Sequence, residues 1–378
     1  MTDADDGRDE VVVCGTGFGR VYLAALRDHP DLRLAGVLAR GSARSAACAR
    51  AAGVPLHTSV DDLPASVRFA CVAVYAGVNG GPGSDMARAL LRRGVHVLQE
   101  GPLHHDELAD TLAAARDSGT VHRVSTHYDR VAPVLRFVAG VRALRSLQPV
   151  RYVEVVCGLQ VLYHALDIVG AALGRWRPWS FEAPPPADRP SGAHAPFRTV
   201  EGEIGGVPVV LRVQNQLNPA DPDNHAHVLF RVTAGGDGGH LLLANAHGPV
   251  LWNPRPHFPR SGQDLPDYGD AAAAHLDLPS VQPWGPSAAP GHREILTGLW
   301  PRAAARGLTE LRRAADQAED PLRRGQYHLT LSRVWQHASA PLGRPEPLHE
   351  PEPVPLSLDE LRARVAPEDE EEDSRART

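Results

Sequence analysis

The sequence predicts an α/β protein in which a doubly wound parallel sheet is followed by a second α+β domain with a mostly antiparallel sheet. Strands alternate with helices over roughly the first 125 residues, which is the pattern of parallel βαβ units. A glycine-rich turn follows the first of these strands. After Pro133, short strands joined by turn residues follow one another closely, as in antiparallel sheets. The length of 378 residues suits two domains.

The first domain is predicted to span residues 11–128 as a Rossmann-type sheet, after a disordered N-terminus over residues 1–10. Its strands are short apolar runs: VVVCG, LRLAGVLAR, VRFACVAVY, VHVLQE and VHRVSTHY. The stretches between them have helical spacing and end at glycine or proline: RVYLAALRDHP, ARSAACARAAG, DMARALLRRG and DELADTLAAARDSG. We expect Asp106 to cap the last of these helices.

The second domain is predicted to span residues 129–340 and to serve substrate binding and dimerisation. Two helical stretches, FVAGVRAL and VLYHALDIVGAAL, accompany the strands VRYVEVVCG, FRTVEGEI, VPVVLRVQNQ, HVLFRVTA and HLLLANAH. A helical stretch over residues 291–337 could return to the first domain. Residues 341–378 are rich in proline and glutamate, so this tail is expected to be largely disordered.

The composition excludes several classes of protein. None of the 39 basic residues is a lysine, which excludes Schiff-base enzymes, pyridoxal-phosphate enzymes and Walker-A nucleotidases, because each needs an amine. The net charge of -6 gives no reason to expect nucleic-acid or membrane binding. The chain has no membrane-spanning run or signal peptide, and its four cysteines lack metal-ligand spacing. We therefore expect a cytoplasmic protein with reduced cysteines and no metal.

A glycine loop lies between the first predicted strand and helix in VVVCGTGFGR. It consists of Gly15, Thr16, Gly17, Phe18 and Gly19. Glycines allow the backbone to approach a pyrophosphate, which the N–H groups of the helix start can then bind. The full G-x-G-x-x-G pattern would need a glycine in place of the following arginine. The loop therefore predicts a cofactor-binding turn, with a simple tight turn as the alternative.

The ends of the next strands predict which dinucleotide is bound. Where an NAD-binding protein usually has an acidic residue, LARGSARS offers Arg40, Ser42 and Arg44, which suit a 2′-phosphate. This favours NADPH, and the alternative is an ordinary basic helix start. Because ligands bind beyond the carboxyl ends of such strands, Tyr75, Glu100 and Pro102 are expected to border the nicotinamide.

These motifs resemble the Gfo/Idh/MocA oxidoreductases, and more closely the thiazolinyl imine reductases of siderophore assembly lines. The resemblance rests on VCGTGFGRVYLAAL, VLARGSARS, VHVLQEGPLHHDEL, QNQLNPADPDNH and ANAHGPVLWNP, and covers roughly residues 11–337. It implies an enzyme that uses NADPH to reduce a thiazoline to a thiazolidine while a nonribosomal peptide synthetase carrier protein holds the substrate. A homodimer is also expected.

The source of the proton is the open question. Members of that family typically have histidine where this chain has Gly101, and their other candidate acid matches Tyr128. We therefore predict Tyr128 as the general acid, with packing at the domain junction as its alternative role. His104 or His105 could instead reach into the room beside Gly101, or His127 could contribute. Because neighbours in an extended strand point oppositely, His127 and Tyr128 should not both face the site.

The helical stretch YHALD contains His164 and Asp167 at a spacing that many Gfo-type dehydrogenases use for substrate contact. The acidic residue that usually precedes this histidine is Gln160 here, so the pattern is half present. Gly101, His127, His164 and Asp167 are the predicted substrate-binding residues. The polar connection QNQLNPADPDNHAH is either a wide hairpin or a surface for the carrier protein. The competing functions are a sugar or polyol dehydrogenase and a catalytically silent NADP-binding sensor.

Overall fold

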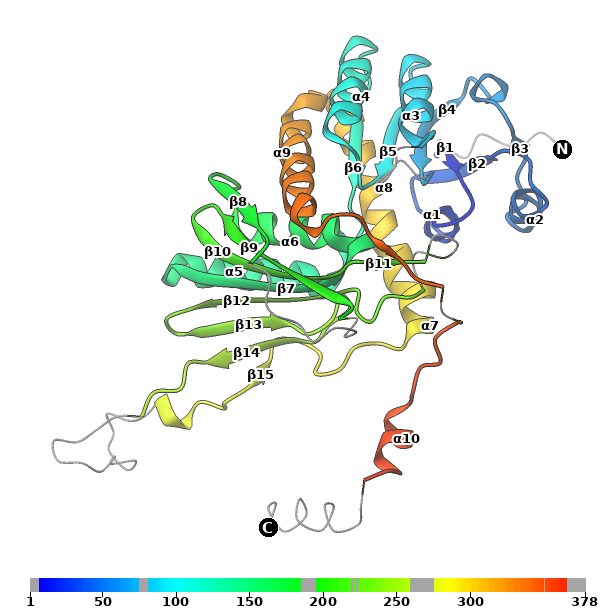
Figure 1. Cartoon of the computed structure of the whole chain (residues 1–378). Coiled ribbons are helices and arrows are strands. Elements are labelled where there is room, and N and C mark those ends of the chain that lie inside the picture. The colour runs from blue at the N-terminus through cyan, green and yellow to red at the C-terminus, as the bar shows by residue number, and fades with distance from the viewer. Residues whose placement is uncertain are drawn as a thin grey trace, which may run out of the picture.

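The computed structural model describes residues 7–74, 81–184, 195–218, 221, 224–258, 275–349 and 351–365. These residues form a parallel sheet with helices on both sides and a larger, mostly antiparallel sheet beside it (Figure 1). The predicted fold class is confirmed.

Six parallel strands form the first sheet in the order β3-β2-β1-β4-β5-β6. They are β1 (Asp9–Cys14), β2 (Leu32–Leu38), β3 (Leu56–His57), β4 (Val67–Val72), β5 (His96–Glu100) and β6 (His122–Ser125). The connecting helices are α1 (Gly19–Leu26), α2 (Ala43–Ala51), α3 (Gly83–Arg92) and α4 (His105–Asp117), with the turn η1 (Val60–Asp62) before β4. Val11, Val12, Val13 and Cys14 are all fully buried, because helices cover both faces of the sheet.

Two helices from the last third of the chain pack on this parallel sheet. They are α8 (Trp300–Asp316) and α9 (Pro321–Ser339). Helix α8 packs against α1 and β5, and α9 packs against α4 and β6. Leu308 and Leu311 of α8 share one apolar cluster with Val11 and Phe69. Residues 300–339 of the predicted second domain are thus part of the cover of the first sheet.

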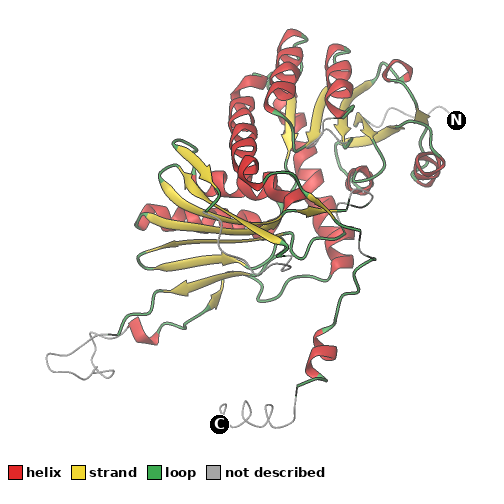
Figure 2. Ribbon diagram, in the orientation of Figure 1, coloured by secondary structure: helices red, strands yellow, loops and turns green. Residues whose placement is uncertain are grey.

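The second sheet has the strand order β15-β14-β13-β12-β7-β10-β9-β8, and only its central pair β7–β10 is parallel. Its strands are β7 (Val150–Gly158), β8 (Trp179–Glu182), β9 (Phe197–Ile204), β10 (Val207–Gln214), β12 (Phe230–Gly236), β13 (Gly239–Leu243), β14 (Val250–Pro254) and β15 (Gln282–Pro283). Helices α5 (Ala132–Leu147) and α6 (Leu162–Leu173) pack together against one face of this sheet (Figure 2). Alternating strand residues bury their side chains beneath these helices.

The remaining elements are short. They are η2 (Tyr128–Arg130), η3 (Leu159–Val161), β11 (Gln216–Leu217), α7 (His292–Glu294), the π-helical turn η5 (Ile295–Leu299), η6 (Ala340–Leu342), β16 (Glu346–Pro347) and α10 (Leu358–Arg362). Strands β11 and β16 pair in parallel, so part of the predicted tail is tied to the body. Helix α10 begins with a capping box between Ser357 and Glu360, a local signal that the tail's composition obscures.

Two boundaries differ from the prediction. Strand β1 begins already at Asp9, because its carboxylate pairs with Arg68 and Arg312. The prediction that Asp106 caps α4 is wrong: His104 is the N-cap, and Asp106 lies in the first turn, where it accepts a hydrogen bond from His105. A carboxylate there still interacts favourably with the helix dipole. Among the described residues, no helix is long and apolar enough to span a membrane.

Candidate functional site

The glycine loop after β1 is a tight turn in which two of the three glycines leave no free space for a Cβ. Gly15 has a φ of +90°, and a Cβ there would lie 2.7 Å from the carbonyl oxygen of Ala73. A Cβ on Gly19 would lie 3.2 Å from Val13, whereas one on Gly17 would meet only the Arg44 guanidinium, at 3.8 Å. Among the described residues no side chain caps α1; instead, the N–H groups of Arg20 and Val21 donate to the carbonyl oxygens of Gly17 and Phe18, at 3.4 Å and 2.9 Å.

The end of β2 brings basic groups to this loop. Nη2 of Arg44 donates a hydrogen bond of 3.1 Å to the carbonyl oxygen of Thr16, which places the guanidinium beside the loop. Arg40 is exposed. Ser42 caps α2 by accepting a hydrogen bond from the backbone N–H of Ser45 at 3.2 Å. A guanidinium beside the glycine loop fits the phosphate groups of a nicotinamide dinucleotide. Tyr75, which is predicted to border the nicotinamide together with Glu100 and Pro102, lies outside the described residues.

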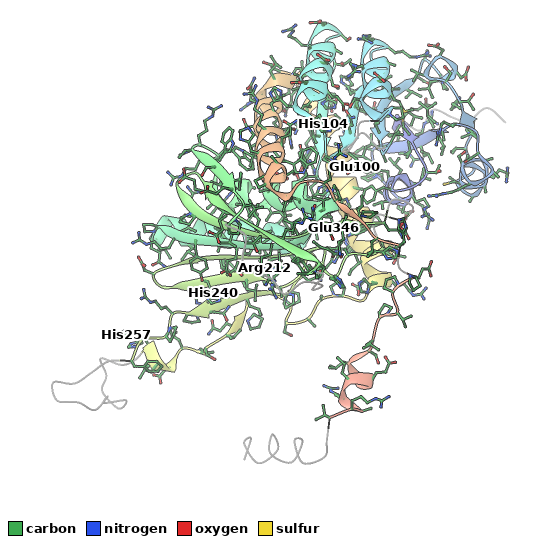
Figure 3. All side chains as sticks on the ribbon, in the orientation of Figure 1. Glu100, His104, Arg212, His240, His257 and Glu346 are labelled. Atoms are coloured by element: carbon green, nitrogen blue, oxygen red, sulfur yellow. The ribbon has the colours of Figure 1, made fainter. Side chains whose placement is uncertain are left out.

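Glu100 is the last residue of β5, and its carboxyl group is hydrogen-bonded by hydroxyls rather than by a cation. Tyr22 of α1 donates a short hydrogen bond to Oε1 of Glu100 and also contacts Oγ of Ser125, at 3.1 Å. Burial raises the pKa of Glu100 to about 7, and the hydrogen bonds from Tyr22 and Ser125 offset part of this increase. Figure 3 labels Glu100 at the junction between the two sheets.

The side chain of Tyr163 packs against Gly101, beside the space that a side chain at this position would need. A Cβ on Gly101 would lie 3.0 Å from Cε1 of Tyr163, the second residue of α6. It would lie 3.6 Å from the carbonyl oxygen of Ser125. The Tyr163 ring is almost completely buried. Pro102 follows Gly101 through a cis peptide bond. The atoms nearest to Gly101 thus belong to Tyr163 and Ser125, and neither His104 nor His105 is among them.

Replacing Gly101 with histidine is expected to destabilise the protein by about 2 kcal/mol, because the new side chain must displace the buried Tyr163 ring. Chemical denaturation of the purified variant measures this loss. Gly291→Ala is the matched control, since no atom lies within 4 Å of its added Cβ. Equal stability of Gly101→His and the wild-type protein would show that Tyr163 can move aside.

A strained turn follows β6, and it sets the orientation of the Tyr128 side chain, which is the predicted general acid. The carbonyl oxygen of Thr126 accepts a hydrogen bond from the N–H of Tyr128 at 2.5 Å, so His127 is the central residue of a γ-turn. Its φ of 56° and ψ of -58° cost about 1–3 kcal/mol for a residue with a side chain. The expectation that His127 and Tyr128 point oppositely is wrong, because the extended strand ends at Ser125.

The turn brings both rings into one aromatic cluster at the junction of the two sheets. The His127 ring lies 5.1 Å from Phe18, 5.5 Å from Tyr128 and 5.3 Å from Trp300, measured between centroids. Tyr128 also contacts Phe230, His164 and His247. Phe18 belongs to the glycine loop, so the Tyr128 ring is separated from that loop by only one layer of aromatic side chains.

The imidazoles around Tyr128 are neutral. Burial lowers the pKa of His127 to about 3 and that of His164 to about 4. Burial likewise lowers the pKa of His247 to about 4, and its Nε2 accepts a hydrogen bond of 3.0 Å from the Trp300 indole. None of the three rings therefore carries a transferable positive charge near neutral pH. The phenol of Tyr128 is the acidic group at the centre of this cluster.

Asp167 is fixed by neighbouring hydroxyl groups. One of its carboxylate oxygens accepts a hydrogen bond of 2.5 Å from Thr126, and the other accepts one of 2.6 Å from Tyr327 on α9. Burial raises the pKa of Asp167, which Thr126 and Tyr327 partly counteract. This arrangement anchors α6, and with it His164, to the turn that carries Tyr128.

The two histidines after Pro102 lie apart from the aromatic cluster. His104 contacts the Trp335 ring, at 5.4 Å between centroids, and its Nδ1 is 3.3 Å from Nε2 of Gln336 (Figure 3). His105 pairs with Asp106 at 2.9 Å on the exposed side of α4. Neither ring is brought together with Tyr128 by these contacts.

Three residues of this region have no local sequence signal. They are Tyr22, which bonds Glu100, and Trp300 and His247, which complete the ring cluster. Tyr22 resembles an ordinary apolar residue of an amphipathic helix. His247 lies in the quoted motif ANAHGPVLWNP, but only the fold brings it to Tyr128.

Two family models match the chain. Residues 10–126 match the oxidoreductase family with an NAD-binding Rossmann fold, and residues 148–253 match the C-terminal domain of the Irp3-like thiazolinyl imine reductases. No curated protein sequence matches the chain.

Solved structures share the fold. KijD10, a 3-ketoreductase from Actinomadura kijaniata in complex with TDP-benzene and NADP, matches with a TM-score of 0.63 and 15% identity over 90% of this chain and 99% of its own. GenD2 from gentamicin A biosynthesis, in complex with NAD, matches with a TM-score of 0.62 and 16% identity over 90% and 96%. At these identities the likeness shows the fold alone.

Proposed function

Because the chain belongs to the Gfo/Idh/MocA oxidoreductases and carries an Irp3-like C-terminal domain, we propose that it reduces a carrier-bound thiazoline with NADPH. The product is a thiazolidine, and the pathway is the assembly of a siderophore or a related nonribosomal peptide. The observation that carries the proposal is the phenol of Tyr128 in a cluster of neutral rings that includes Phe18 of the glycine loop.

We assign a separate role in the proposed reaction to each of these residues. NADPH, when bound, supplies the hydride for the carbon of the C=N bond. Arg40, Ser42 and Arg44 hold the 2′-phosphate that distinguishes it from NADH. Tyr128 donates its phenolic proton to the ring nitrogen as that nitrogen gains electrons. The apolar rings around Tyr128 exclude water from this transfer.

The remaining predicted residues support the pocket. His127 and His164 line it as neutral rings. Asp167 positions His164 through its hydrogen bonds to Thr126 and Tyr327. His104 and His105 lie at the start of α4, outside the ring cluster, and have no part in the proposed reaction. Gly101 leaves room for the Tyr163 ring.

We also propose that a carrier protein docks beside the polar connection after β10 and that two copies form a homodimer. Within the described part of this connection, Gln214 bonds the backbone of His225 and His227, and Asn224 bonds Asp221. The alternative that this connection is a wide hairpin is wrong, because β10 and β12, the strands it joins, are separated in the sheet by β7. The bonds hold described parts of the connection together beside the proposed docking surface. The uncovered face of the second sheet is the surface proposed for dimerisation.

Mixing the protein with NADPH and a small thiazoline thioester tests the function directly. Oxidation of the nicotinamide, followed by its absorbance, should require the thiazoline, and the product should gain two hydrogen atoms by mass spectrometry. Turnover of sugars or polyols instead would favour the dehydrogenase alternative. Tight NADPH binding without turnover of either substrate would favour a silent sensor.

A further inference from the structure

We propose that Glu100 is a neutral carboxylic acid when the reduced cofactor is bound and ionises when the cofactor is oxidised, so that its carboxylate balances the positive charge of the oxidised ring. The inference rests on the nicotinamide-binding part of the proposed function and does not depend on the thiazoline. It assigns to Glu100 a charge-compensating role in addition to contact with the cofactor.

The contacts of Glu100 distinguish it from an ordinary ion-paired carboxylate. Its Oε1 is bonded by the hydroxyl of Tyr22, and Ser125 is the second hydroxyl beside it. Within the described part of the chain, no arginine or histidine forms an ion pair with it. A buried carboxyl group with hydroxyl partners and no cation is held less firmly in its charged form than one paired with arginine.

Within the described part of the chain, the charged and titratable groups on the neighbouring elements do not form a direct ion pair with Glu100. Arg130 of η2 pairs with Asp129 at 2.8 Å and with Glu310 of α8 at 3.0 Å. The charge of Arg130 lowers the pKa of Glu100 and that of Asp129 raises it, so the two partners of this ion pair act in opposite directions. Cys71 of β4 is a buried thiol whose pKa is raised, first by burial. On the side toward α3, the neighbouring β5 residue Gln99 contacts Ser84 and His122, and burial keeps His122 neutral.

The hydroxyls suit both charge states of Glu100. When the carboxyl group is ionised, the hydroxyls of Tyr22 and Ser125 can donate to it. When it is protonated, its own O–H can donate to the oxygen of Tyr22, which in turn donates to Oγ of Ser125. Ser125 Oγ also accepts the backbone N–H of His127, at 3.3 Å. Neither state leaves the carboxyl group without a partner, and burial brings the pKa of Glu100 to about 7.

Glu100 lies where the charge of a bound nicotinamide ring would affect whether its carboxyl group is ionised. It ends β5, between β4 and β6, at the carboxyl edge of the sheet, where ligands of doubly wound folds bind. A reduced nicotinamide ring is neutral, whereas the oxidised ring carries one positive charge. A nearby cation lowers the pKa of a carboxyl group, because it stabilises the charged form. Oxidation of the ring is therefore expected to release the proton of Glu100.

The ratio of the dissociation constants for NADP⁺ and NADPH, measured by calorimetry from about pH 5 to about pH 8, tests this inference without any substrate. Both dinucleotides share the titrating phosphates, so these cancel in the ratio. The ratio should fall by about tenfold as the pH rises toward the pKa of Glu100, because only NADP⁺ binding gains from its ionisation; tenfold corresponds to one pKa unit.

Two variants test whether the pH dependence of this ratio comes from the Glu100 carboxyl group. Glu100→Gln cannot ionise, so its ratio should not change over the same pH range. Tyr22→Phe keeps the ring but removes a hydrogen bond that lowers the pKa of Glu100, so the fall should move to higher pH. Circular dichroism establishes that both variants are folded. If Glu100→Gln does not fold, the shift in Tyr22→Phe decides the question.

A wild-type ratio that does not vary with pH would overturn the inference, as would the same slope in Glu100→Gln or an unshifted one in Tyr22→Phe. Failure of both dinucleotides to bind would overturn it together with the proposed cofactor. Absence of thiazoline turnover with the predicted pH dependence intact would contradict the proposed substrate alone.

Discussion

Tyr128→Phe is expected to lower kcat for thiazoline reduction by about a hundredfold, within the range that a general acid contributes. The variant loses the phenolic hydrogen of Tyr128, and among the described residues of the ring cluster His127, His164 and His247 are held neutral by burial. The phenylalanine ring keeps the edge contact with Phe230, at 5.0 Å, so the fold and NADPH affinity should be unchanged. Steady-state kinetics together with NADPH binding measures the two quantities separately.

His105→Ala is the matched control for this prediction, because its ring pairs with Asp106 on the exposed side of α4. It should retain the wild-type kcat. Equal rates in Tyr128→Phe and wild-type protein would remove Tyr128 as the proton donor. A large loss in His105→Ala would instead show that α4 reaches the reaction site in a way the contacts of His105 do not indicate.

The parallel sheet could be predicted because its determinants are local. The run from Val11 to Cys14 is apolar on both faces, and Gly15 and Gly19 follow at the positions where a Cβ would strike neighbouring backbone or side-chain atoms. Each of these features depends on residues only a few positions apart. The same holds for the turn residues that separate the strands of the second sheet.

The geometry of the candidate acid could not be predicted, because it depends on a backbone conformation that the residue types disfavour. Nothing in STHYD indicates that His127 adopts a positive φ, and the run VHRVSTHY predicts a strand that continues through Tyr128. The turn is maintained by long-range contacts: Trp300 and Phe18 pack on His127, and Asp167 bonds Thr126. Such contacts are set by tertiary structure.

The glycine at residue 101 likewise has a long-range contact, with Tyr163, that the sequence alone does not reveal. The resemblance to the imine reductases implies only that their histidine is missing, whereas the structure places the Tyr163 ring against that position. The glycine is thus compatible with a packed junction, and it does not by itself indicate a lost site. A titratable group at this strand end is still present, one residue earlier, in Glu100.

The double variant Arg40→Ala/Arg44→Ala is expected to weaken NADPH binding by more than about a hundredfold while changing NADH binding little. Hydrogen bonds between a guanidinium group and a phosphate are charge-assisted, and each contributes roughly 1.5–3 kcal/mol. Both arginines follow β2, and Arg44 is already directed to the glycine loop by its bond to Thr16. Titration of each dinucleotide by fluorescence or calorimetry gives the two affinities.

Arg50→Ala is the matched control, because this arginine lies in the last turn of α2, at the opposite end of the helix from Arg44. The comparison also separates specific contacts from general charge, since Arg50→Ala removes one positive charge from the same helix without affecting the loop. If the double variant bound NADPH and NADH with the same ratio as the wild-type protein, the arginines would not read the 2′-phosphate. Any preference for NADPH would then have to come from groups outside the end of β2.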